Sequence, residues 1–230
     1  MSDLKITVVI PAFNEEQAIG DVVSAVPADM VQEIIVVDNG STDETAANAS
    51  SAGARVIQEP RPGYGAACRA GANAADDADV IVFIDGDRSD DPEQLPLIAG
   101  PVLDHQADLV IGSRITGSLE KGAMPLHGRL GNRLIVYLLR LLYGTHITDI
   151  GSFRAIKAHT LGNLNMEQMT YGWPVKMVVK AARQGLKIKS VPINYRRRIG
   201  ESKVTGTVRG SILATWYMFL VPLKYFFMKV

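Results

Sequence analysis

Short apolar runs alternate with longer mixed stretches through the first half of this chain. Five of the runs have the length of strands and cover residues 6–10, 34–37, 55–57, 80–84 and 109–111. The stretches between them are of helical character, and strands that alternate with helices are typical of a parallel sheet. We therefore expect an α/β fold with a parallel sheet flanked by helices.

Polar residues mark two helix starts between these strands. Asn14 with Gln17, and Ser41 with Glu44, have the spacing of a capping box, in which two side chains bond the free amides of a helix start. Apolar residues at helical spacing follow the first box: Ile19, Val22, Val23 and Val26. Helix starts that follow strands place both along one edge of the sheet, and ligands bind at that edge in open α/β sheets.

Two longer apolar segments lie in the second half of the chain. Residues 130–143 are apolar on nearly every side, and a buried helix is one explanation. Residues 212–228 are interrupted by Pro222 and Lys224 and fall short of the about 20 apolar residues that cross a bilayer. Their aromatic and basic residues suit the membrane interface, and the alternative is a helix packed on the protein's own core or on a second subunit. We expect one domain over residues 1–206 and a C-terminal apolar segment over residues 207–230.

Charge is divided unevenly between the two halves of the chain. Residues 1–108 contain 20 acidic and 5 basic residues, whereas residues 109–230 contain 4 and 19, although the formal net charge is zero. A basic half favours an anionic partner such as phosphate or a membrane surface. Nucleic acid is not expected, because the aromatic residues near the basic ones lie in an apolar run instead of a stacking platform. A single cysteine, Cys68, and the lack of a secretory signal indicate a reducing, cytoplasmic location.

A cluster of carboxylates follows the fourth apolar run. Asp85 and Asp87 flank Gly86, which lets the chain turn between them. Two carboxylates at this spacing can face one hard divalent cation, which keeps positions free for phosphate oxygens. The alternative is a simple turn, since Asp and Gly are common turn residues. The cluster makes a metal and diphosphate site the first candidate for chemistry in this chain.

Ordered motifs extend this interpretation to most of the chain. The first three are VIPAFNEE at 9–16, VVDNGSTD at 36–43 and DGD at 85–87. Three more are GSR at 112–114, DIGSFR at 149–154 and RRIGESK at 197–203. The first set resembles glycosyltransferase family 2, which has the GT-A fold. The second set resembles the subgroup of dolichol-phosphate mannose synthases and bacterial polyprenyl-phosphate glycosyltransferases. The resemblance implies the Rossmann-like GT-A sheet, which is mixed and mostly parallel and is flanked by helices.

The resemblance implies a site for a nucleotide sugar. It places the nucleotide beside the loop after the first strand and beside a later glycine turn, with the base and ribose at the end of the second run. The residues at these positions are Pro11, Phe13, Glu15, Val37, Asp38, Asn39 and Gly63. Asn39 stands where the family usually has an acid, and Ser89 where the mannose synthases often have a glutamine. The base, in GDP or UDP, and the sugar therefore stay open.

The resemblance also implies the groups that balance the charge of a leaving diphosphate, which is usually the largest catalytic term. The metal candidates, for magnesium or manganese, are Asp85 and Asp87 beside Gly86. Arg114, Arg198 and Lys203 are the candidates for contact with phosphate, and the last two lie in a loop able to close over nucleotide. Asp149 could act as a base, a metal neighbour or a loop anchor. The catalytic candidates are Asp87, Asp149, Arg198 and Lys203.

The activity implied is inverting, metal-dependent transfer of a hexose from GDP-mannose or a UDP-sugar to a polyprenyl phosphate of the dolichyl type. A phosphate acceptor is already ionised near neutral pH, so it needs positioning more than a base. Arg129, Arg133 and Arg154 are the candidates to hold it. One alternative is transfer to a soluble or glycan hydroxyl, with Asp149 or Asp91 as the base, and another is a sugar-nucleotide-binding protein without turnover. We expect a peripheral protein at the cytoplasmic face of the membrane, and self-association is left open.

Overall fold

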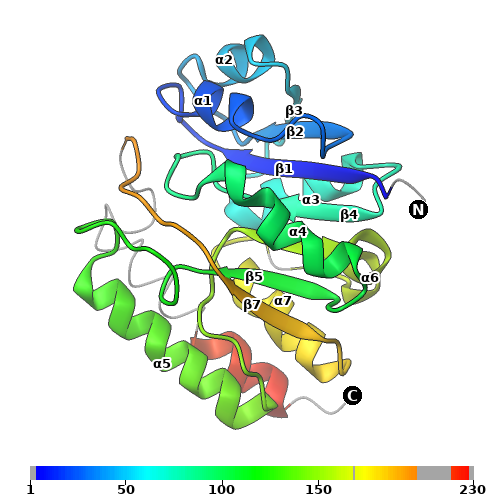
Figure 1. The fold of residues 1–230 in the computed structure, drawn as a ribbon, viewed down its shortest axis with the longest axis vertical. Helices are drawn as coiled ribbons and strands as arrows, with labels where there is room; N and C mark the ends of the chain where they lie inside the picture. The colour runs from blue at the N-terminus through cyan, green and yellow to red at the C-terminus, as the bar shows by residue number, and fades with distance from the viewer. Residues whose placement is uncertain (1–3, 168, 201–218, 228–230) are drawn as a thin grey trace.

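A computed structural model of the protein describes residues 4–167, 169–200 and 219–227. Among these residues, one sheet of seven strands has the order β3-β2-β1-β4-β6-β5-β7, and Figure 1 shows it running through the middle of the molecule. The strands are β1 (Ile6–Ala12), β2 (Glu33–Asp38), β3 (Arg55–Gln58), β4 (Val80–Phe83), β5 (Leu109–Ser113), β6 (Arg154–Lys157) and β7 (Ile188–Pro192).

The sheet is mixed and mostly parallel, which confirms the expected fold class. β1 pairs in parallel with β2 and β4, β2 pairs in parallel with β3, and β5 pairs in parallel with β7. β6 runs antiparallel between β4 and β5. Arg154, the first residue of β6, pairs with Phe83 and Ile111 near the carboxyl ends of β4 and β5. The chain that enters β6 therefore reaches the same edge of the sheet as the carboxyl ends of its neighbours.

Helices cover both faces of the sheet. They are α1 (Ile19–Ser24), α2 (Thr45–Ser51), α3 (Tyr64–Ala74), α4 (Leu95–Leu103), α5 (Leu126–Tyr143), α6 (Ala158–Leu164) and α7 (Trp173–Arg183), with a short 3-10 helix η1 (Pro92–Gln94). Successive side chains of a strand point to opposite faces, so Val8 and Ile10 pack with α1, α2 and α4, while Val9 packs with α3 and α7. Two apolar cores, one on each face, hold the strand ends in place.

The first five strands lie within two residues of their predicted positions, but the two predicted capping boxes are wrong. α1 begins only at Ile19 and α2 at Thr45, and neither start has a hydrogen bond from a capping side chain. Asn14 Oδ1 instead accepts a bond from the Thr42 amide, and Ser41 Oγ accepts one from the Asn14 amide, both at 2.9 Å. These polar side chains therefore join the loops after β1 and β2 to each other.

α5 departs from the sequence-based expectation of a buried helix. Its buried residues are Ile135 and Leu139 alone, and one side of the helix faces outward. A helix over residues 219–227 lies beside α5, as Figure 1 shows in red. The Tyr143 hydroxyl donates to the Pro222 carbonyl, and the ring of Tyr143 packs edge-on against Phe226. This part of the C-terminal segment thus packs on the protein, while residues 207–218 and 228–230 lie outside the described residues.

Across the described ranges, no helix has the combination of length and apolar character that crossing a bilayer requires.

Candidate active site

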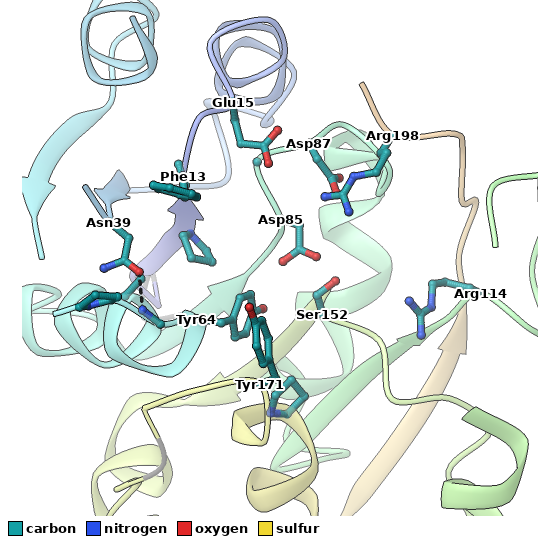
Figure 2. Close-up of a pocket in the computed structure, with 17 residues that line it drawn as sticks. Phe13, Glu15, Asn39, Tyr64, Asp85, Asp87, Arg114, Ser152, Tyr171 and Arg198 are labelled. Atoms are coloured by element: carbon teal, nitrogen blue, oxygen red, sulfur yellow. Dashed lines mark hydrogen bonds and ion pairs between the residues drawn. The ribbon is translucent and has the colours of Figure 1, made fainter. Parts of the chain in front are cut away.

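A cavity of about 490 Å³ opens at the carboxyl ends of β1, β2, β4 and β5. Figure 2 shows its lining as sticks, with the Asp85 carboxylate between the loops that follow the strands. The site residues expected from the sequence that line it are Pro11, Phe13, Glu15, Asn39, Gly63, Asp85, Gly86, Asp87, Arg114 and Arg198. The volume is typical of a small-molecule pocket, so the fold gathers these expected residues from six separate chain segments around one ligand-sized space.

Asp85 and Asp87 face the pocket from the loop after β4. Among the described residues, Asp85 Oδ1 is buried without a hydrogen-bond partner. Burial and the neighbouring charge of Asp87 raise the pKa of Asp85 above its ordinary value of 3.8. A divalent cation would satisfy this oxygen and remove the repulsion, so the two carboxylates fit a hard metal ion. No group of three metal-binding acids, histidines or cysteines occurs in the described ranges, so other ligands of such an ion would come from substrate or water.

Gly86 lets the chain pass tightly between the two carboxylates. A Cβ atom added to Gly86 would lie 3.2 Å from a methyl group of Ile19 and 3.4 Å from one of Ile10. Both neighbours are fully buried in the core. A larger residue would therefore push the carboxylate loop out of place.

Asp87 is held by the segment that follows β7. Its Oδ2 pairs with Arg198 Nη2, its Oδ1 accepts a bond from the Ser89 amide at 2.9 Å, and its carbonyl accepts one from the Ile199 amide at 2.9 Å. Arg198 lines the pocket and is the counter-charge of Asp87 in this structure. The guanidinium thus sits at the position from which it can contact a phosphate bound beside Asp87. Lys203, the other cation expected in this segment, lies outside the described residues.

Arg114 enters the pocket directly after β5 and is fixed by Asp149. The fully buried Asp149 carboxylate accepts bonds from the Arg114 amide (2.8 Å), Nε (2.8 Å) and Nη2 (2.6 Å). The guanidinium carbon also lies 5.2 Å from the centre of the Tyr195 ring. Although burial opposes the charge, Asp149 raises the pKa of Arg114, which stays protonated. Asp149 does not line the pocket, so of the three roles considered for it the structure supports the anchor.

The residues expected to read the base and ribose are largely used by the protein itself. Val37 is fully buried in the core, and neither it nor Asp38 lines the pocket. Asp38 is buried, and its two oxygens accept bonds from the Ser41 amide at 2.9 Å and Gln58 Nε2 at 3.0 Å. Asn39 does line the pocket, with its amide bonded to the turn that precedes α3. In this arrangement the Asp38 carboxylate bonds the protein and does not line the pocket.

The turn before α3 is a tight close approach of two chain segments. Gly63 has a φ of 136°, and a Cβ atom there would lie 2.2 Å from the Met169 carbonyl oxygen. The Gly63 amide is bonded to Asn39 Oδ1 at 2.8 Å, and the Ala66 amide to the Met169 carbonyl at 3.0 Å. Two amides that could have received an anion are thus taken, and the turn serves to shape the pocket wall.

The basic residues expected to hold an acceptor phosphate do not line the pocket. Arg129 and Arg133 are exposed on α5. Arg154 is buried and donates to the Pro174 and Gly151 carbonyls, which corrects the expectation that it binds phosphate. Asp91, considered as a base, is buried in an ion pair with Arg196 at 2.8 Å. Arg114 and Arg198 remain the arginines of the pocket lining.

Three residues near the carboxylates were not assigned a role from the sequence. Ser152 lines the pocket and donates from Oγ to Asp90 Oδ2 at 3.1 Å. Asp90 is buried, and burial and then the charge of Asp85 raise its pKa well above 3.8. Tyr171 also lines the pocket from the loop before α7. Ser152 belongs to the DIGSFR motif and Asp90 lies three residues after the DGD motif, whereas no local pattern marks Tyr171.

Comparison with known proteins agrees with this geometry. Residues 7–163 match the family model described as glycosyl transferase family 2. An uncharacterized glycosyltransferase of Mycobacterium tuberculosis is 38% identical over 212 residues, covering 91% of this chain and 94% of that protein. A dolichyl-phosphate hexose transferase of Haloferax volcanii is 35% identical over 211 residues, covering 90% of each chain.

The fold has solved counterparts. Glucosyl-3-phosphoglycerate synthase from Mycobacterium tuberculosis was crystallised in complex with Mn²⁺, UDP-glucose and phosphoglyceric acid. That structure superposes with a TM-score of 0.77 at 25% sequence identity, covering 99% of this chain and 81% of that chain.

Proposed function

Because this chain belongs to glycosyl transferase family 2, we propose that it transfers a hexose, with inversion, from a nucleotide sugar to a polyprenyl phosphate. The observation that carries the proposal is the pocket in which the carboxylates of Asp85 and Asp87 converge with Arg114 and Arg198, from three chain segments. Such a set suits a ligand that brings both a diphosphate and a cation. The similar dolichyl-phosphate hexose transferase supports the class of acceptor.

In this proposal the donor diphosphate lies between the carboxylates and the arginines. Asp85 and Asp87 would hold a magnesium or manganese ion, which would supply positive charge for the leaving diphosphate. Arg198 contributes a cation beside Asp87, and Arg114 is held ready by Asp149 without having to order itself on binding. Phe13, which is 42% exposed at the pocket, offers an apolar surface to the nucleotide.

The acceptor is proposed to be a phosphate because the pocket provides cations and lacks the two carboxylates considered as bases. Asp149 and Asp91 are both buried in ion pairs outside the pocket lining. A hydroxyl acceptor needs its proton removed, whereas a phosphate monoester is ionised near neutral pH and needs only orientation and charge balance. Transfer to a phosphate thus requires positively charged groups, which this pocket contains.

Acceptor choice is tested by labelling. The protein is given UDP-glucose or GDP-mannose with a labelled sugar, magnesium or manganese, and either undecaprenyl phosphate or phosphoglyceric acid. The proposal predicts label in an organic-phase lipid, and label only in water-soluble product would contradict it. Asp87→Asn should abolish turnover, and Asp77→Asn, at a side chain 76% exposed, serves as the matched control. A rate unaffected by Asp87→Asn would contradict the metal role, whereas no turnover of the wild type with either acceptor would favour the non-catalytic alternative.

A lipid acceptor also calls for contact with a membrane, and we propose that α5 and the helix over 219–227 make that contact. The apolar side chains exposed along α5 are Leu126 (72%), Leu130 (61%), Leu134 (55%), Tyr137 (63%) and Leu141 (68%). Their spacing of three or four residues places them on one side of the helix. The adjoining helix adds Leu220, Leu223, Phe226 and Phe227. We call these nine residues the α5 surface.

The charges around the α5 surface favour an anionic lipid surface as the partner. Arg129, Arg133, Arg140 and Lys224 are exposed on the same two helices, and neither helix contains Asp or Glu. Each basic residue near an anionic leaflet adds on the order of 1 kcal/mol to binding. A second copy of the chain docked through this surface would instead bring like charges together. The proposed location is the cytoplasmic face of a membrane, reached without a spanning helix in the described residues.

Sedimentation with liposomes tests this contact separately from turnover. The full chain should sediment with vesicles that contain phosphatidylglycerol and much less with phosphatidylcholine alone. Leu130→Glu combined with Leu134→Glu should reduce the bound fraction at least about tenfold, because two apolar contacts are lost. Leu97→Glu, at a residue 49% exposed on α4, is the control and should sediment like the wild type. Equal sedimentation of the double variant would show that the α5 surface is not the contact.

A further inference from the structure

The side chain of Asn39 is bonded within the protein through both of its polar atoms. Its Nδ2 donates to the Glu59 and Arg61 carbonyls, and its Oδ1 accepts from the Gly63 amide, each at 2.8 Å. A primary amide has two N–H donors and a carbonyl oxygen that can accept two bonds, and three of these four positions are used here. The orientation of the amide is also determined, because a flipped amide would set its oxygen against two carbonyl oxygens. Asn39 therefore holds residues 59–63 in one defined conformation.

This arrangement leaves one end of the pocket without a carboxylate from β2. The Asp38 carboxylate is buried and bonded to Ser41 and Gln58. In Figure 2 the carboxylates of Glu15, Asp85 and Asp87 lie together, away from Asn39, with Phe13 between Asn39 and Glu15. The end of the pocket formed by Phe13, Asn39 and Gly63 thus has no charged group among these side chains. We call it the neutral end.

We propose that Asn39 is a positioning residue that makes the neutral end a uracil site and selects a UDP-sugar over a GDP-sugar. This inference rests on the proposed function, because the diphosphate must lie at Asp85 and Asp87 for the base to reach the neutral end. Guanine presents adjacent N1–H and N2–H donors, which a carboxylate accepts with its two oxygens. Uracil presents a single N3–H donor between two carbonyls. Without a carboxylate, guanine would leave two adjacent donors to be paired at the neutral end, whereas uracil would leave one.

The pocket walls give the base its remaining contacts. Phe13 is 42% exposed and can stack on the base, which favours either base through its ring face. The opposite wall is the 59–63 segment, whose position depends on the three bonds of Asn39. An aspartate at this position has no N–H to donate, so its oxygens would repel the Glu59 and Arg61 carbonyls. Asn39→Asp would then loosen the wall and at the same time introduce a carboxylate.

Equilibrium titration of the protein with UDP and with GDP, each with magnesium, tests the inference. The wild type should bind UDP at least about tenfold more tightly than GDP, since each donor left unpaired on burial weakens binding by that order. Asn39→Asp should weaken the binding of UDP at least about fivefold. It should also bring the affinities for UDP and GDP closer together. Asn48→Asp, which makes the same change at an exposed amide that donates to the Glu16 carbonyl, should change neither affinity.

The outcomes separate this inference from the proposed function. Tighter binding of GDP than UDP by the wild type would overturn the uracil site while leaving a nucleotide-sugar enzyme in place. Binding of neither nucleotide would overturn the proposed function and this inference with it. Wild-type affinities in Asn39→Asp would overturn the positioning role. The comparison of UDP with GDP needs only the wild type, so it stands even if Asn39→Asp fails to fold.

Discussion

Replacing Asp149 by asparagine should destabilise the protein by about 3 kcal/mol. The carboxylate is fully buried and receives three bonds from Arg114, whose side chain is only 16% exposed. Removing one partner of a buried ion pair costs about 3–5 kcal/mol, because the other charge is left in a low dielectric without compensation. Asparagine keeps the shape and one acceptor, so the lower end of that range applies. A loss of 3 kcal/mol shifts the folding equilibrium roughly a hundredfold.

Urea denaturation of Asp149→Asn, Arg114→Gln and the double variant measures this loss and its origin. The double variant should lose less than the sum of the single ones, with a coupling energy of at least about 1.5 kcal/mol. The pair of Glu33 and Arg55 is the control, since it has similar two-point geometry at the surface, with bonds of 2.6 and 3.1 Å and side chains 32% and 44% exposed. Glu33→Gln should cost at most about 1 kcal/mol.

The same variants distinguish an anchor from a catalytic base. An anchor predicts that Asp149→Asn lowers stability and weakens nucleotide binding through a misplaced Arg114, with the pH dependence of kcat unchanged. A variant as stable as the wild type, with a large fall in kcat and the loss of one limb of the pH profile, would refute the anchoring role and restore the base.

Two further predictions concern strain and burial. Gly63→Ala should lose at least about 2 kcal/mol in urea denaturation, because φ is 136° and the Cβ would lie 2.2 Å from a carbonyl oxygen. Gly53→Ala, at a position with a φ of 98° and open space around it, should lose only about 1 kcal/mol of unfolding free energy. Equal losses in Gly63→Ala and Gly53→Ala would contradict the close approach at Gly63. Burial raises the pKa of Asp90 above 3.8, so the native state holds a proton that the unfolded chain releases. The free energy of unfolding of the wild type should therefore fall as the pH rises from 3.8 toward the raised pKa, and it should fall less in Asp90→Asn. Equal pH dependence of the two unfolding free energies, measured by urea denaturation, would contradict this.

The strands of the first half could be predicted because burial on both faces makes them continuous apolar runs. Val80 to Ile84 is one such run, and it is buried throughout. β6 and β7 were not predicted as strands, since Arg154 and Lys157 bound the first and Lys189 interrupts the second. Their assignment depends on tertiary partners that a local pattern does not contain.

Local polar patterns misled at the helix starts. Asn14 and Ser41 have the spacing of caps, yet they bond across two loops that the parallel pairing of β1 and β2 brings together. α5 shows the same limit for apolar patterns, because Leu130 and Leu134 read as core residues and are more than half exposed. A sequence shows which residues are apolar and does not show what covers them.

The site was predicted best where strands end in charged residues. Asp85, Asp87, Arg114 and Arg198 were expected together and do share one pocket. Asp149 was expected to act in the same site, but it forms an ion pair with Arg114. The two residues are 35 positions apart in the sequence, so no local pattern predicts their contact. Tyr171 was missed for the same reason, since only the folded chain brings the loop before α7 to the pocket.

The most direct test of the central claim is anomalous scattering from manganese in crystals grown with Mn²⁺ and UDP. The account predicts one manganese ion at coordination distance from the carboxylates of Asp85 and Asp87, with the diphosphate between that ion and Arg198. Manganese bound elsewhere, or both carboxylates turned away from a bound diphosphate, would contradict it.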